Sequence, residues 1–235
     1  MKRFATCLLT TLLLAPAFSF AEDDSEATAT ADTKIVLFDG KSLDNWKGRE
    51  DLWSIEDGQI VGRTTEANPI DANTFLIYEG DVPEDFELTV WFKIEAGNSG
   101  IQYRSRIVNE DKFIVGGYQA DIDFTNRFAG ILYEERGRGI LAQRGQQVTI
   151  TADGKKKNES FADAKELGNA IHPGQWNEFR VVARGNRLQH FINDTLTAEV
   201  TDEQSEKAST DGVIALQLHV GPPMTVRFKN ISLQK

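Results

Sequence analysis

The chain has 235 residues, of which 40% are hydrophobic and 26% are charged, so it can bury a core and is not expected to be disordered throughout. Its 26 Lys and Arg residues stand against 36 Asp and Glu residues, a net charge of −10. This balance excludes a protein that binds nucleic acid or an anionic membrane surface, because both functions need a basic surface.

The first 21 residues have the three-part pattern of a secretory signal peptide. Lys2 and Arg3 precede an apolar run over residues 4–14, and Ser19-Phe20-Ala21 places small residues three and one positions before a cleavage site. The run is shorter than the ~20 residues that span a bilayer, so we expect no membrane span. We expect cleavage after Ala21 and a secreted or periplasmic protein.

The only cysteine, Cys7, lies inside this signal. The mature chain is therefore expected to lack disulfides, thiolate metal sites and cysteine nucleophiles. Residues 22–33 are acidic and small and have no periodicity, which predicts a flexible linker. We expect one folded domain over residues 34–235.

From residue 35 onward, short apolar or alternating runs are separated by turn signals, which is typical of strands. The predicted strands cover residues 53–55, 59–61, 86–94, 101–105, 114–123, 130–134, 148–151, 179–183, 188–192, 213–220 and 226–233. Residues 161–169 alone have a weak helical pattern, and residues 136–175 read as an irregular insertion long enough for a functional flap. Many strands at short spacing, without a βαβ rhythm, predict an all-β antiparallel sandwich of the jelly-roll kind.

Three of the predicted strands carry an apolar face and a distinct polar face, because side chains alternate along a strand. The polar face holds amide, carboxylate, guanidinium and imidazole groups, from Gln102, Arg104, Gln119, Asp121, Asp123, Gln217 and His219. An ordinary solvated sheet face is one explanation. Planar groups of this kind also suit hydrogen bonding to sugar hydroxyls or carboxylates, so a ligand-binding face is the other.

Several motifs resemble the 3-keto-disaccharide hydrolase domain family, in family order from residue 35 to residue 233. They are Leu37-Phe-Asp-Gly-Lys-Ser-Leu-Asp-Asn-Trp46, Trp53-Ser-Ile-Glu-Asp-Gly58, Gly97-Asn-Ser-Gly-Ile101, Tyr118-Gln-Ala-Asp121, Gly130-Ile-Leu-Tyr133, Trp176-Asn177, Leu216-Gln-Leu-His219 and Phe228-Lys-Asn-Ile231. The resemblance implies a concanavalin A-like or laminin G-like jelly roll. It also implies a secreted bacterial protein that acts on glycosides with a ketone at carbon 3 of the sugar.

Cleavage of such a glycoside has known chemical requirements. The ketone acidifies the hydrogen on carbon 2, so elimination across carbons 1 and 2 needs a base, a donor to the enolate oxygen and an acid for the leaving group. Direct hydrolysis would instead use two carboxyl groups flanking the bond. A divalent cation such as Ca²⁺ is a third device, and Asp121 or Asp123 would be its ligands.

Asp121 and His219 are the candidate base and acid, because both residue types can be tuned to titrate near neutral pH. Alternatively, Asp121 forms a structural pair with Arg104, and His219 caps the turn at Gly221-Pro222-Pro223. In the functional interpretation, Arg104 orients the substrate or stabilises the enolate. Gln119, Asp123 and Gln217 then recognise hydroxyl groups.

The segment Tyr133-Glu134-Glu135-Arg136 adds further candidates. Tyr133 either stacks on a sugar ring or belongs to the core. Glu134 is the candidate second carboxylate, and Arg136 is a candidate substrate contact or a solvated loop charge. His190 shares a face with Leu188 and Ile192, which predicts a histidine at the edge of the core.

Two functions remain open from the sequence. The first is a secreted enzyme that cleaves 3-keto-glycosides through Asp121, Glu134 and His219, with a carbohydrate substrate and functional coupling to an oxidoreductase that makes the keto sugar. The second is a carbohydrate-binding or adhesion module on the same fold, because this sandwich hosts both roles. The charged groups on the polar face outnumber its aromatic groups, which favours the enzyme.

Overall fold

The structure is a computed structural model that describes Met1 and residues 34–235. The expected signal peptide and acidic linker fall on residues 2–33, outside the described part of the chain. No helix in that described part is long and apolar enough to cross a membrane.

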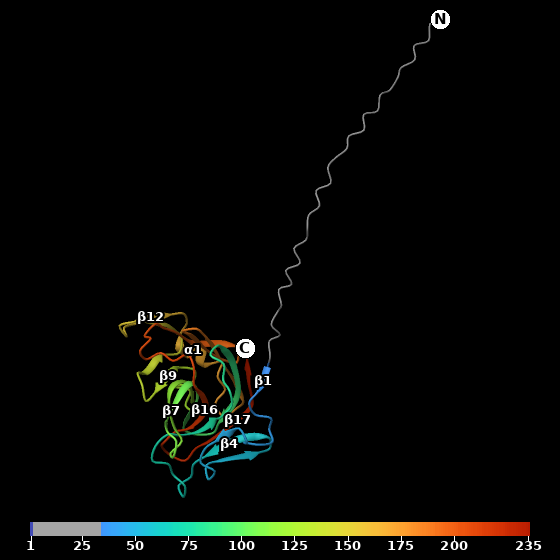
Figure 1. Cartoon of the computed structure of the whole chain (residues 1–235), viewed down its shortest axis with the longest axis vertical. Coiled ribbons are helices and arrows are strands. Elements are labelled where there is room, and N and C mark those ends of the chain that lie inside the picture. The colour runs from blue at the N-terminus through green and yellow to red at the C-terminus, as the bar shows by residue number, and fades with distance from the viewer. Residues whose placement is uncertain (2–33) are drawn as a thin grey trace. The chain divides into compact units, whose positions relative to one another are not determined.

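Residues 34–235 form two β-sheets that pack face to face, as Figure 1 shows. The large sheet has the strand order β12 (Lys156–Ser160), β11 (Gln146–Ile150), β15 (Thr195–Asp202), β14 (Arg187–Ile192), β13 (Asn177–Arg184), β6 (Phe86–Ile94), β17 (Thr225–Gln234), β4 (Gln59–Arg63), β3 (Trp53–Glu56), with β1 (Lys34–Val36) also paired to β17. The small sheet has the order β10 (Gly139–Ala142), β9 (Leu132–Glu135), β8 (Ile114–Asp123), β7 (Asn98–Asn109), β16 (Val213–Leu218), β5 (Thr74–Tyr78), β2 (Trp46–Lys47). The predicted all-β sandwich is confirmed.

The core lies between the sheets and follows from strand alternation. In β6, Phe86, Leu88, Val90, Phe92 and Ile94 are buried, while the residues between them are partly exposed. Burial of this apolar row stabilises the sandwich by roughly 1.5–3 kcal/mol per large side chain. Strand β8 differs, because all ten of its residues are buried. The outward side chains of β8 are therefore largely shielded from solvent, unlike those of an ordinary solvated face.

The stretch over residues 136–175 is more regular than predicted. It contains β10, β11, β12 and the short helix α1 (Ala164–Gly168), which Asp163 caps through its side chain. Strand β11 also pairs with β15 in parallel, so the sandwich is not purely antiparallel. Of these strands the sequence predicts the one at residues 148–151, which overlaps β11, but it gives little sign of β12, because all residues of β12 are exposed.

Candidate active site

A pocket of about 420 Å³ opens on the outward face of the small sheet, at one end of β7, β8, β9 and β16. Its polar lining consists of Asn73, Asn98, Gln119, Asp121, Asp123, Glu135 and His219. Its apolar lining consists of Phe128, Ile131, Tyr133 and Ile140. Polar groups that can hydrogen-bond therefore face a pocket that also has an apolar wall, which is the usual composition of a small-molecule site.

The strand register brings these side chains together. Gln119 pairs with Tyr133, Asp121 with Gly100, and Asp123 with Asn98 across the neighbouring strands. Gly100 matters because a Cβ atom at this position would lie within 2.7 Å of the Gln119 side chain. Glycine thus leaves the space that Gln119 occupies beside Asp121.

Asp121 is the most perturbed acid of the pocket. Its side chain is only 6% exposed, and the Asn98 amide donates a hydrogen bond of 2.7 Å to its Oδ1. The pKa of Asp121 is raised to about 8, chiefly by burial and also by the negative charges of Asp123 and Glu135, while the Asn98 hydrogen bond opposes the shift. The expected pair with Arg104 does not form. Asp121 is thus tuned to exchange a proton near neutral pH.

Glu135 and His219 also line the pocket, and Asn73 connects Glu135 to Val220, the residue after His219. The Asn73 amide donates to Glu135 Oε1 at 3.2 Å, and its Oδ1 accepts from the Val220 N–H at 2.9 Å. His219 Nδ1 lies 2.6 Å from the Val220 carbonyl. A carbonyl can only accept, so Nδ1 carries a proton, and Nε2 is the ring nitrogen left for a ligand. His219 therefore contacts the backbone just after the end of β16 and also lines the pocket.

Tyr133 is half-buried and lines the pocket, so it does not belong to the core. Burial, with the negative charges of Glu135 and Asp121, raises its pKa above the usual value for a phenol. Its hydroxyl group stays protonated and can donate to a ligand oxygen.

Gln119 is held by two buried glutamines. Gln102 Nε2 donates to Gln119 Oε1 at 2.6 Å, and Gln217 Nε2 donates to the same oxygen at 3.0 Å. Gln217 is fully buried and does not line the pocket, so the structure places it behind Gln119 and not against a ligand. Of the two predicted amide contacts, only Gln119 reaches the pocket.

Asp123 lines the pocket but is committed to a turn. Its Oδ2 accepts hydrogen bonds from Thr125 Oγ1 at 2.6 Å, from the Arg127 N–H at 2.7 Å and from the Phe128 N–H at 3.1 Å. Ca²⁺ needs about six to eight oxygen ligands. Residues 34–235 contain no group of three or more His, Cys, Asp or Glu that is arranged to hold a metal ion. The donor set around Asp121 and Asp123 does not fit the expected cation.

Glu134 is not in the pocket, which corrects its predicted position. It accepts from Arg138 Nε at 2.7 Å, and Arg138 Nη2 donates to Asp202 Oδ2 at 2.6 Å. Tyr118 also donates to Asp202 Oδ2, at 2.6 Å. Side chains alternate along β9, so Glu135 shares the outward face with Tyr133, two residues earlier. Glu134 lies on the opposite face and belongs to this buried network.

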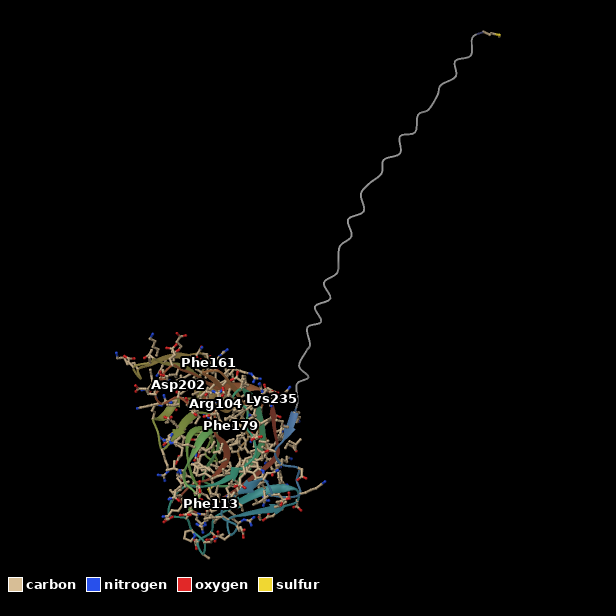
Figure 2. The ribbon with its side chains drawn as sticks, in the orientation of Figure 1. Arg104, Phe113, Phe161, Phe179, Asp202 and Lys235 are labelled. Atoms are coloured by element: carbon tan, nitrogen blue, oxygen red, sulfur yellow. The ribbon has the colours of Figure 1, made fainter. Side chains whose placement is uncertain are left out.

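Arg104 is also away from the pocket, although it was predicted on the polar face. The pairing of β7 with β8 shifts register between Tyr103 and Arg106, and Arg104 has a φ of 44°. This bulge turns the side chain, which is 2% exposed and donates to the carbonyl groups of Glu84 at 3.0 Å and Gly185 at 2.6 Å (Figure 2). Arg104 therefore links the loops that contain Glu84 and Gly185. Arg136 lies exposed in the turn after β9, and it does not line the pocket either.

His190 is buried as predicted and supports the pocket wall from the core side. Its Nδ1 lies 3.1 Å from the Ile131 carbonyl, and its Nε2 lies 2.9 Å from the Tyr103 hydroxyl. Nδ1 therefore donates to the carbonyl, and Nε2 accepts from the tyrosine. Burial lowers the pKa of His190 to about 3, so the ring remains neutral.

Six lining residues were not predicted from the sequence: Asn73, Asn98, Phe128, Ile131, Glu135 and Ile140. Alternation from Tyr133 indicates Glu135, and alternation along β7 places Asn98 with Gly100. Asn73 precedes β5 in a loop and has no comparable signal.

A family model described as the 3-keto-alpha-glucoside-1,2-lyase-like domain matches residues 33–234 of the chain. No curated protein matches its sequence. Many solved structures have similar folds, among them the following three. A protein provisionally described as a glycosyl hydrolase, from Parabacteroides distasonis, is 18% identical, with a TM-score of 0.57 over 86% of this chain and 98% of that one.

The other two structures come from Bacillus subtilis. The carbohydrate-binding module CBM66 is 15% identical, with a TM-score of 0.52 over 81% of this chain and 96% of that one. A protein of unknown function with a galectin-like fold is 10% identical, with a TM-score of 0.55 over 86% of this chain and 94% of that one. At these identities the likeness concerns the fold alone, which hosts both enzymes and binding modules.

Proposed function

The chain belongs to the 3-keto-alpha-glucoside-1,2-lyase-like domain family, and from this premise we propose that it cleaves 3-keto-glycosides in the pocket around Asp121. The observation that carries the proposal is the state of Asp121. Its carboxyl group is buried beside two other acids, and its pKa is raised to about 8. A binding module needs hydrogen-bonding groups but no titratable group of this kind, so the pocket favours an enzyme.

The reaction that suits this pocket is elimination across carbons 1 and 2. Ionised Asp121 removes the proton from carbon 2, and the electron pair passes into the ketone at carbon 3 to give an enolate. The enolate then expels the oxygen on carbon 1, which leaves a double bond between carbons 1 and 2 and a free alcohol. Water can add back across this double bond to give the free keto sugar. Hydrolysis is then the sum of the two steps.

The raised pKa suits Asp121 to the role of base. A carboxylate that holds its proton up to about pH 8 is a stronger base, once ionised, than an ordinary aspartate. A base is most effective when its pKa lies near the working pH, because it is then both sufficiently ionised and sufficiently basic. The same group could act as an acid, and the pH dependence of the rate distinguishes the two roles.

The other pocket residues have complementary roles in the proposal. The Tyr133 hydroxyl donates to the enolate oxygen, and the protonated imidazole of His219 gives its Nε2 proton to the leaving oxygen. Glu135 keeps the pKa of Asp121 high, and Gln119 with Asn98 binds sugar hydroxyls. Phe128, Ile131 and Ile140 cover the carbon face of the ring and exclude water.

The cellular setting is also part of the proposal. The pattern over residues 1–21 supports secretion or a periplasmic location, with cleavage after Ala21. A 3-keto substrate requires a preceding oxidation of a sugar hydroxyl. An oxidoreductase that acts on the sugar would therefore supply the substrate.

The test is incubation of the protein with a 3-keto-disaccharide in D₂O, with the unoxidised disaccharide as control. We expect release of the free sugar from the keto form only, with deuterium at carbon 2 of the keto product. Release without deuterium would replace elimination with direct hydrolysis. Saturable binding of either sugar without any release would assign the chain to the binding modules.

The Arg136→Ala variant is the matched control for Asp121→Asn and His219→Ala, because Arg136 is exposed and outside the pocket. We expect it to retain full activity while both pocket variants lose it. Equal losses in all three variants would contradict the assignment of the pocket.

A further inference from the structure

A second cavity, of about 430 Å³, lies on the outward face of the large sheet, on the opposite side of the sandwich from the pocket around Asp121. We call it the β6–β17 cavity. Its lining includes Trp91 and Thr89 from β6, Glu178 from β13, Ser232 from β17 and Val36 from β1. Lys34, Asp39 and Asn230 also line it.

A bulge in β17 shapes the cavity. The pairing of β17 with β6 shifts register between Lys229 and Ser232, and Asn230 between them has a φ of 50°. Bulges re-aim side chains and interrupt the regular sheet surface. Here the interruption lies beside Trp91, which pairs directly with Lys229 on one side and with Glu178 on the other.

Trp91 differs from the two tryptophans of the core. Trp46 and Trp53 are buried in the core, whereas Trp91 points outward from β6 and is partly exposed. Trp176 is also partly exposed, and Lys229 Nζ lies 4.1 Å from its ring centre and 5.6 Å from that of Trp91. Core packing does not explain an indole in this position. A partly exposed indole beside a cavity offers a flat apolar platform with a polar edge.

The charged side chains around this platform are not paired with one another, although Asp39 accepts hydrogen bonds from the backbone N–H groups of Lys41 and Ser42. Among the described residues, Lys34, Asp39, Glu178 and Lys229 form no ion pair. Two of these side chains are positive and two are negative, so the charges cancel locally even though the whole chain carries −10. A site without net charge does not select an ion. Hydroxyl, amide, carboxylate and ammonium groups around an aromatic face suit a neutral ligand with many hydroxyls.

We propose that the β6–β17 cavity is a second carbohydrate-binding site, which holds an unoxidised neutral oligosaccharide against Trp91. The C–H face of a sugar ring packs on the indole, and its hydroxyl groups bond to Glu178, Thr89 and Asn230. Binding at this site does not require a ketone at carbon 3 of the sugar, and it does not depend on turnover in the pocket around Asp121. It tethers the protein to a glycan, whatever the fate of the keto sugar.

The experiment is calorimetric titration of the full chain with cellohexaose and, separately, with maltohexaose. We expect saturable binding of at least one of them at up to millimolar concentration, and loss of about tenfold or more in affinity for Trp91→Ala. Trp91→Phe keeps a platform and should retain part of the affinity. Phe191→Ala is the matched control, because Phe191 is a partly exposed aromatic on the same sheet face, where it contacts Arg180 outside the cavity.

Two further readouts separate this site from the pocket and from an ion site. Tyr133→Ala should leave hexaose binding unchanged, and Trp91→Ala should leave cleavage of a soluble 3-keto-disaccharide unchanged. Binding should also be insensitive to salt, because the ligand is neutral. Absence of hexaose binding, or equal binding by wild type and Trp91→Ala, would overturn the proposal. Loss of binding in Tyr133→Ala alone would place the hexaose in the pocket and overturn it as well.

Discussion

The two faces of the small sheet carry two groups of buried carboxylates that differ in their partners. On the inner side, Glu134 of β9 shares Arg138 with Asp202, which comes from β15 of the large sheet, and Tyr118 adds a hydrogen bond to Asp202. On the outer side, Asp121 and Glu135 receive amide hydrogen bonds from Asn98 and Asn73. None of the described basic side chains forms an ion pair with either of these two outer acids.

The partners decide what each group can do. The ion pairs with Asp202 and Glu134 raise the pKa of Arg138, against the effect of its own burial, so Arg138 stays charged. Burial without a cation instead raises the pKa of Asp121 to about 8, and the outer group can change its protonation state. A buried carboxylate with a cation fixes structure, whereas a buried carboxylate without one is suited to proton transfer.

The Asp121→Asn variant tests the outer group most strongly. If Asp121 is the base, we expect kcat to fall by about a thousandfold or more, because a positioned base contributes about 10²–10⁴. Steady-state kinetics on a 3-keto-disaccharide measures this loss. Activity within about tenfold of wild type would remove Asp121 from the role of base.

The same variant should be more stable than wild type at high pH, although it loses activity. The pKa of Asp121 in the folded protein is raised above its ordinary value of 3.8, so the fold favours the protonated form. The stabilisation is complete below pH 3.8 and is lost as the pH rises through about 8. Asp121→Asn cannot ionise, so its melting temperature should exceed that of wild type at pH 9 and approach it below pH 3.8. A lower melting temperature at both pH values would indicate a structural role.

Asp202→Asn tests the inner group. The substitution weakens the pair with Arg138 and leaves a buried guanidinium with one carboxylate, so we expect a loss of about 3 kcal/mol in the free energy of unfolding. Urea unfolding followed by tryptophan fluorescence measures the loss. The kcat of the folded protein should stay near the wild-type value, since Asp202 does not line the pocket. A large drop in kcat with unchanged stability would contradict the comparison between the two groups.

The pH dependence of kcat/KM sharpens the role of Asp121. A base must be ionised, so the rate should rise about tenfold per pH unit below the Asp121 pKa of about 8. Glu135→Gln removes a negative charge near Asp121, which lowers the pKa and should move the rising limb to lower pH. A rate without this rising limb would remove Asp121 from the role of base.

Strand alternation explains which parts of this site could be predicted from the sequence. The regular alternation of β6 and β8 gives both the core row and the outward row with Gln119, Asp121 and Asp123. The same rule applied to Tyr133 indicates Glu135. Glu134 was predicted from its place at the end of a strand, without regard to the face of that strand.

The remaining errors in the predicted site and fold come from features that strand alternation does not predict. Arg104 leaves the polar face because of a bulge at a residue that is not glycine, and the local sequence gives no signal for it. Asn73 reaches the pocket from a loop before β5, so its contact with Glu135 depends on tertiary structure. Strand β12 has no apolar residue, and its pairing with β11 likewise depends on the rest of the fold.

Gln217→Met is the mildest test, because Gln217 acts on the pocket only through Gln119. Methionine has a similar length, but it removes the 3.0 Å hydrogen bond to Gln119 Oε1, while the bond from Gln102 remains. We expect KM to rise by about threefold to tenfold and kcat to stay nearly constant, since a positioned hydroxyl contact is weakened and the proton-transfer groups are untouched. Gln147→Met is the control, because Gln147 bonds to Glu199 on the large sheet and does not line the pocket. An equal rise in KM for both variants would mean that the effect of Gln217→Met does not come from its contact with Gln119. A loss of kcat in Gln217→Met alone would mean that Gln119 takes part in the chemistry and not only in binding.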